Sequence, residues 1–290
     1  MADFLQFLFS GITVGAAYAL AALGFTIIYN TSGVINFAQG EFIMLGGMLS
    51  AALAAVGMPL YVAIALAVVA TGVVGLIIER FAIEPAKNAD VITLIIITIG
   101  AALTVRGLIQ VVLGKGTRAI PSFSGDDPVT VLGATIMPQS FWVLGVSLLV
   151  VLLLAWFFGK TMLGKAMLAT SYNKLASQLV GVNTRLILLL SFGLSAVLGA
   201  VGGAILTPIT LTSYDIGIML GLKGFVAAVL GGMGSGAGVV AGGLILGIAE
   251  SMTAGYVSSS YKDAVPFVLI LLILLVKPNG LFSAASSERV

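Results

Sequence analysis

Two residue types with versatile chemistry are missing from this chain, because its 290 residues include no cysteine and no histidine. The absence of cysteine excludes disulfides and thiol nucleophiles, and the absence of histidine removes the commonest general base and a frequent zinc ligand. We therefore expect no metal site, no cofactor held by this chain, and neither metal-dependent nor acid–base catalysis.

Charge is also scarce. Charged residues make up 8% of the chain, against roughly 25% in an ordinary soluble domain, while 60% of the residues are hydrophobic. This composition is typical of a polytopic membrane protein, in which the 37 glycines would serve close helix packing. The net charge of +2 is too small to suggest a nucleic-acid partner. We expect one transmembrane domain over residues 1–290.

Motifs for nucleotide binding are incomplete. The glycine-rich residues 231–238 do not complete the pattern G-x-G-x-x-G and follow no predicted strand. The run Gly159-Lys160-Thr161 resembles the end of a Walker A loop, but Leu154 occupies the position of its first glycine. The chain is therefore expected to hydrolyse no nucleotide, so that active transport would need an ion gradient or a separate ATPase.

Apolar segments able to cross about 30 Å of hydrocarbon predict an all-α fold with about eight or nine transmembrane helices, some of them broken or re-entrant. The predicted helices cover residues 4–29, 39–56, 59–78, 91–113, 140–158, 186–208, 218–230, 238–253 and 264–276. The first is expected to be retained, because it lacks a basic start and a cleavage site. The count is eight if the glycine-rich pair forms a hairpin that does not fully cross.

The connections differ in charge. Residues 79–90, which contain Glu79, Arg80, Glu84, Lys87 and Asp90, are predicted to form a short cytoplasmic loop, and residues 114–139 an external loop. The segment 159–185 carries four bases and no acid, which assigns it to the cytoplasm and places the N-terminus outside and the C-terminus inside. Its apolar residues recur at helical spacing, so we expect short surface helices offered to a partner.

Several polar residues lie in or near predicted spans. Asn36, Gln39 and Glu41 follow a glycine-broken run, a place where transporters commonly put their pathways, although N-terminal capping alone would explain Glu41. Lys223 and Glu250 are candidates for the pathway by the cost of burying them, or form a structural pair that keeps two helices in register.

The chain resembles the integral-membrane permeases of bacterial branched-chain amino acid ABC importers, of the LivH type. The similarity covers almost the full length, and its motifs are residues 33–41 (GVINFAQGE), 179–184 (LVGVNT), 223–235 (KGFVAAVLGGMGS), 242–250 (GGLILGIAE), 261–263 (YKD) and 277–282 (KPNGLF). Gln39 stands where members often have His. Tyr172-Asn173 stands where many have an acidic pair, so the contacts with the ATPases would rely less on salt bridges.

The resemblance implies a multi-pass protein of the bacterial inner membrane, surrounded by lipid. Its implied partners are a LivM-like second permease, two ATPase subunits of the LivG and LivF types that bind ATP and Mg²⁺, and a periplasmic solute-binding protein. The segment 159–185 would dock into the ATPases, with the implied interface at Gly164, Lys165, Ala169, Asn173, Lys174, Ala176 and Gly181, of which Gly164, Ala169, Ala176 and Gly181 are interface or turn residues.

Other functions remain open from the sequence. The cargo could be urea, a short amide or another amino acid, since permeases for these are similar. The broken helices, with Lys223 and Glu250, also suit a stand-alone secondary transporter or channel. A membrane-embedded enzyme would have to rely on carboxylates, and neither Glu41 nor Glu250 has an evident partner acid.

Overall fold

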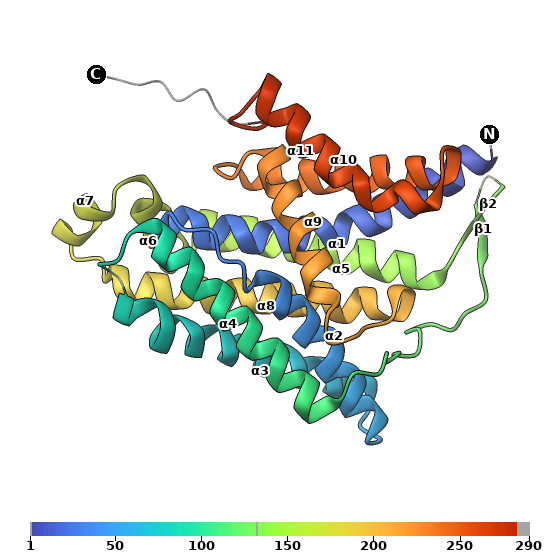
Figure 1. Cartoon of the computed structure of the whole chain (residues 1–290), viewed down its shortest axis with the longest axis horizontal. Coiled ribbons are helices and arrows are strands. Elements are labelled where there is room, and N and C mark those ends of the chain that lie inside the picture. Colours follow the sequence, from blue (N-terminus) through green and yellow to red (C-terminus); the bar gives the residue numbers. More distant parts are fainter. Residues whose placement is uncertain (1, 87, 132, 283–290) are drawn as a thin grey trace.

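The computed structural model describes residues 2–86, 88–131 and 133–282, so Lys87 of the predicted 79–90 loop lies outside the described residues. The helices are α1 (Ala2–Ser32), α2 (Gln39–Ala55), α3 (Leu60–Ile78), α4 (Val91–Leu113), α5 (Pro138–Lys160), α6 (Met162–Tyr172), α7 (Lys174–Leu179), α8 (Thr184–Thr210), α9 (Ile216–Gly231), α10 (Gly236–Tyr256) and α11 (Val265–Val276) (Figure 1). Within the described ranges, seven helical segments are long and apolar enough to cross a membrane. With the shorter apolar helices α2 and α9, they confirm the predicted polytopic all-α fold.

Helix α1 lies at the centre of the bundle. Every residue from Gly15 to Ile28 is buried, which accounts for the near absence of polar residues in this stretch. Small residues bring α1 against the antiparallel α10: a Cβ added at Gly15 would lie 2.9 Å from the carbonyl oxygen of Gly243. In lipid, helix association depends on such close packing, because no water is released between apolar surfaces.

The polar run between α1 and α2 is an interruption inside the protein. Gly33 has a φ of +73°, and Asn36 and Ala38 are buried. The Asn36 Oδ1 atom accepts from the backbone N–H of Ala38 at 3.0 Å, and the Thr98 hydroxyl accepts from the backbone N–H of Phe37 at 3.2 Å. Irregular backbone at membrane depth requires such cover, so the predicted break is confirmed.

Helices α2 and α9 are short, at 17 and 16 residues, and they cross at their first turns. A Cβ added at Gly217 would lie 2.6 Å from the carbonyl oxygen of Gly40, and one at Gly221 would lie 2.9 Å from the Gly40 Cα. The backbones of Gly40, Gly217 and Gly221 therefore lie in direct contact, with the Glu41 carboxylate beside Gly217, and the N-terminal ends of both helices meet within the bundle.

The two ends of the molecule carry different connections (Figure 1). Helices α6 and α7 lie at one end, while the N-terminus and the hairpin of β1 (Val129–Val131) and β2 (Ala134–Ile136) lie at the other. Gln6 Nε2 donates to the Thr135 carbonyl at 2.8 Å and fixes the hairpin to α1. The backbone N–H of Leu281 donates to the Leu230 carbonyl, which returns the end of the described chain to the turn between α9 and α10.

Two predicted loops contain regular structure. Residues predicted as the 79–90 loop instead continue α3 as a π-helix, η1 (Glu79–Ile83), and a 3-10 turn, η2 (Glu84–Ala86). Glu79 is buried in this continuation, whereas the neighbouring Arg80 is exposed. In the predicted 114–139 loop, β-branched residues form the antiparallel hairpin, in which Thr130 pairs with Thr135. A 3-10 turn, η3 (Ser259–Ala264), precedes α11.

Candidate functional site

An acid–base pair lies between α2 and α4. Glu41, in the first turn of α2, has only 1% of its surface exposed and forms an ion pair with Arg106 of α4. The prediction that Glu41 occupies the first turn is confirmed. Arg106 is 20% exposed in its side chain and reaches inward to Glu41, so it serves as the counter-ion of a buried carboxylate.

This pair lines a cavity of about 200 Å³ between α1, α2, α4 and α9. The two charged side chains line this cavity together with Phe25, Phe37 and Phe225. The ring centroids of Phe25 and Phe37 lie 5.9 and 6.0 Å from that of Phe225, so the three rings form one aromatic cluster. The site therefore combines both signs of charge with an apolar surface in a small volume.

Asn36 and Gln39 are fully buried but do not line this cavity. The Gln39 Oε1 atom accepts from the Ser195 hydroxyl at 2.5 Å, and its Nε2 atom donates to the Ser195 carbonyl at 3.2 Å. Gln39 thus joins the start of α2 to α8, while Asn36 caps the interrupted backbone before it. Their role in the structure is to hold α2 where Glu41 reaches the cavity.

Lys223 and Glu250 form the ion pair that the sequence left as one alternative. The pair joins α9 to α10, and Asp263 of η3 adds a second carboxylate 2.7 Å from Lys223 Nζ. Tyr18 of α1 donates to Glu250 Oε2 at 2.8 Å. Both carboxylate oxygens of Glu250 are therefore used, and this geometry favours the structural alternative, in which the network keeps three helices in register. The sequence analysis named Asp263 only as part of the motif 261–263 and did not predict its ion pair with Lys223.

The basic segment 159–185 folds into the two short helices that were predicted. The Thr161 hydroxyl accepts from the Gly164 N–H at 3.0 Å and caps α6, and the Asn173 Oδ1 atom accepts from the Ala176 N–H at 2.9 Å and caps α7. Six of the seven proposed interface positions are exposed, namely Lys165, Ala169, Asn173, Lys174, Ala176 and Gly181.

Gly164 differs from the other six because it is buried where α6 turns back against α5. A Cβ at this position would lie 2.7 Å from backbone carbons of Phe157 and Phe158. A glycine is therefore required for the turn itself, and this geometry favours the turn role among the two alternatives for Gly164.

Large apolar side chains are exposed along the same segment. Met162, Tyr172, Leu179 and Val180 each expose 79–88% of their surface. They are accompanied by the bases Lys165 and Lys174 and by no acid. This end of the molecule therefore exposes a basic, apolar surface, and an exposed apolar patch with polar surroundings is typical of protein contacts.

Comparison with known proteins places the chain in a family. The family model described as "Branched-chain amino acid transport system / permease component" matches residues 7–274. The chain belongs to this permease family. This membership agrees with the resemblance inferred from the motifs, and the seven apolar helical segments of the described residues suit a permease.

Individual relatives are similar in sequence to this permease along almost its whole length. The high-affinity branched-chain amino acid transport system permease protein LivH of Escherichia coli K12 is 36% identical over 304 residues, which cover 99% of this chain and 98% of the relative. The corresponding protein BraD of Pseudomonas aeruginosa is 33% identical over 301 residues, with the same coverage. A chain of PsaBC from Streptococcus pneumoniae, solved in complex with Fab, matches this chain with a TM-score of 0.54 at 14% sequence identity. The match covers 95% of this chain and 92% of the PsaBC chain, and it shows a similarity of fold alone.

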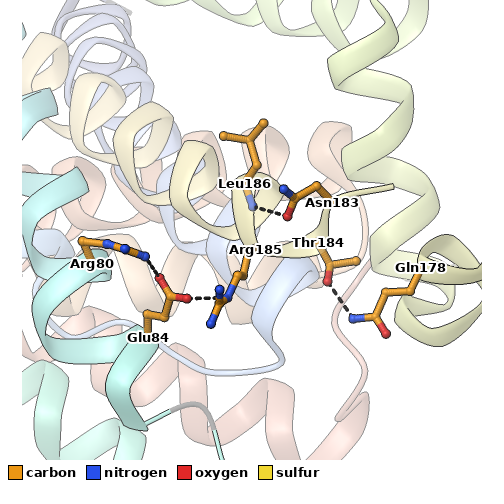
Figure 2. Close-up of polar contacts among 7 residues, drawn as sticks. All are labelled: Arg80, Glu84, Gln178, Asn183, Thr184, Arg185 and Leu186. Carbon is orange, nitrogen blue, oxygen red and sulfur yellow. Dashed lines mark hydrogen bonds and ion pairs between the residues drawn. The ribbon is translucent and has the colours of Figure 1, made fainter. Parts of the chain in front are cut away.

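In this permease, an ionic contact ties the end of the basic segment to the end of α3 (Figure 2). Arg185 Nε lies 2.5 Å from Glu84 Oε1, and Arg80 pairs with the other oxygen of Glu84. Gln178 Nε2 donates to the Thr184 hydroxyl at 2.8 Å within the segment. Charged side chains therefore link the end of the basic segment to the helical continuation of α3.

Two functional residues escaped the sequence analysis. Arg106 lies one or two turns from the far end of the predicted helix 91–113, a position from which a long base can extend to the lipid headgroups, but in the structure it pairs with Glu41 instead. Glu84 was assigned to a loop, although its spacing of four from Arg80 fits a helical ion pair and could have indicated the continued helix.

Proposed function

We propose that this chain is the transmembrane permease subunit of a bacterial ABC importer for branched-chain amino acids, located in the inner membrane. It would work with a LivM-like second permease, two ATPase subunits of the LivG and LivF types, and a periplasmic binding protein that delivers the cargo. ATP and Mg²⁺ would be bound by the ATPases. Full-length similarity to two permeases named for branched-chain amino acid transport supports the choice of cargo.

The observation that carries the proposal is the basic segment at one end of the molecule. Its two capped helices present exposed apolar side chains and lysines, with an ionic connection to α3. Such a surface suits a cytoplasmic partner with an apolar groove rimmed by acidic residues. Energy released in that partner would reach the spans through α5 and α8, which flank the segment, and through α3.

The test is reconstitution of the complex in liposomes. The chain, the second permease and the ATPases encoded beside it are co-expressed, purified and supplied with the binding protein, and uptake of labelled leucine is measured with and without ATP. We expect ATP-dependent uptake by the complex and none by this chain alone.

The variant Ala169→Arg introduces a long charged side chain on the exposed face of α6 and should abolish co-purification of the ATPases. The matched control Thr130→Arg adds the same side chain on the exposed strand β1, at the opposite end of the molecule, and should leave the complex intact. Retention of the ATPases and of uptake in Ala169→Arg would contradict the proposal. Flux driven by an ion gradient through this chain alone would instead establish the stand-alone transporter.

A further inference from the structure

The Glu41–Arg106 cavity contains unused hydrogen-bonding capacity. Glu41 bonds to Arg106 through Oε1, while its Oε2 atom is buried and has no hydrogen-bond partner among the described residues. The buried Nε of Arg106 has none either. A buried polar group without a partner destabilises the protein, so two of them beside one cavity point to a ligand that would satisfy both.

The second buried ion pair of the protein provides the contrast. Lys223 bonds to both Glu250 and Asp263, and the remaining oxygen of Glu250 accepts from Tyr18. None of these residues lines the Glu41–Arg106 cavity. A network that serves only to hold helices together is thus complete in itself, whereas the Glu41–Arg106 pair is incomplete.

The rest of the cavity wall is apolar. The aromatic cluster of Phe25, Phe37 and Phe225 faces the same space as Leu103 and Leu222. A ligand that fits must therefore carry a cation and an anion close together, joined to a compact hydrocarbon group. An α-amino acid with a branched aliphatic side chain has this composition.

The cavity opens on an apolar face of the bundle. Ile99, Leu103 and Ile218 line it and expose 41–59% of their surface. Ionisable residues within spans normally face the interior of a bundle or an aqueous path. In the proposed complex, the second permease would cover this face and enclose the path along which cargo moves.

We propose that Glu41 and Arg106 form the binding site for the zwitterionic part of the cargo within the membrane. Glu41 Oε2 accepts from the ammonium group, Arg106 Nε donates to the carboxylate, and the aromatic cluster packs against the side chain. This inference rests on the proposed function, which makes an amino acid the cargo. It adds a selection step inside the permease that follows selection by the binding protein.

The test measures binding to the assembled complex without its binding protein. Equilibrium dialysis with labelled leucine gives the affinity, and two unlabelled competitors each lack one charge: isopentylamine has no carboxylate, and 4-methylpentanoate has no ammonium group. We expect each competitor to bind about tenfold to hundredfold more weakly than leucine, which is the loss that follows removal of one charged hydrogen-bonding group. This comparison uses the wild-type protein and does not depend on the folding of a variant.

Variants then assign the site. Glu41→Gln and Arg106→Gln, combined in one protein, replace the ion pair by two amides of similar size. We expect this variant to assemble with its partners and to lose leucine binding by about tenfold or more. The matched control Arg118→Gln removes an arginine in the connection after α4, outside the cavity, and should bind leucine as the wild type does.

The outcomes separate this inference from the proposed function. Equal competition by leucine and both analogues, or unchanged leucine binding in the double variant, would overturn the inference and leave a purely structural pair. ATP-driven uptake by a complex that binds no leucine without its binding protein would overturn it as well, while the proposed function stands. Absence of ATP-driven uptake in the wild-type complex would overturn the proposed function itself.

Discussion

The contact of α1 with α10 predicts that the substitution Gly243→Ala destabilises the protein. A Cβ added at Gly243 would lie 2.6, 2.7 and 2.8 Å from the N, Cα and Cβ atoms of Ala19. Carbon atoms in favourable contact are about 3.5–4.0 Å apart, so the helices would have to separate by roughly 1 Å. Two of the three contacted atoms belong to the backbone of the most buried helix and cannot rotate away.

The magnitude follows from two opposing effects. Overpacking a close contact typically costs about 1–3 kcal/mol, whereas replacing glycine by alanine within a helix gains up to about 1 kcal/mol. The control Gly145→Ala, in α5, has the same helical gain, because nothing lies within 4 Å of the added Cβ. The helical gain cancels between the two variants, so their free energies of unfolding should differ by about 1–3 kcal/mol.

The assay is unfolding of the purified chain in detergent micelles by increasing SDS, followed by far-ultraviolet circular dichroism. Wild type, Gly243→Ala and Gly145→Ala are compared under one condition, and the midpoints give the order of stability. We expect Gly145→Ala to be the most stable and Gly243→Ala the least. Equal stability of the two variants would refute the close crossing of α1 and α10.

Two further predictions concern the ion pairs. Lys223→Met leaves the carboxylate of Glu250 buried without its cation and should lower the free energy of unfolding by about 3–5 kcal/mol in the same SDS assay. Adding Glu250→Gln removes that charge and should recover most of the loss, so a double variant as unstable as the single one would contradict the pairing. Arg185→Gln breaks the contact with Glu84, and because the arginine side chain is 63% exposed, the free energy of unfolding should change by less than about 1 kcal/mol. It should nevertheless lower the amount of leucine taken up per ATP hydrolysed in liposomes, and unchanged coupling would exclude a role for this contact.

Much of the fold could be predicted because the length of an apolar run and the residues that end a helix can be identified within a short stretch of sequence. The prediction for α4, residues 91–113, matches the structure at both ends, since Asp90 and Gly114 bound an uninterrupted apolar run. The break before α2 was predicted for the same reason, from a glycine followed by clustered amides. The continuation of α3 was missed because charged residues after Ile78 were interpreted as solvent-exposed, whereas Glu79 is buried.

The site was harder to predict because it depends on how helices are rotated against one another. Glu41 and Arg106 are 65 residues apart, and the sequence offers four charged residues within spans that could pair in more than one way. Only the assembled bundle shows that Arg106 faces Glu41 and Lys223 faces Glu250. Periodicity could not decide this, because α2 and α4 are apolar on nearly all sides.

The crossing of Gly40 with Gly217 and Gly221 has a mechanical consequence. Interlocked side chains resist a change of crossing angle, because each must leave its groove before the helices can turn. Here glycine backbones touch and the Glu41 carboxylate is the side chain beside them, so a change in the crossing angle of α2 and α9 requires few rotamer changes at the contact. Gly217 and Gly221 also border the Glu41–Arg106 cavity, and a small scissoring motion would therefore widen or narrow its mouth while the charged pair stays in place.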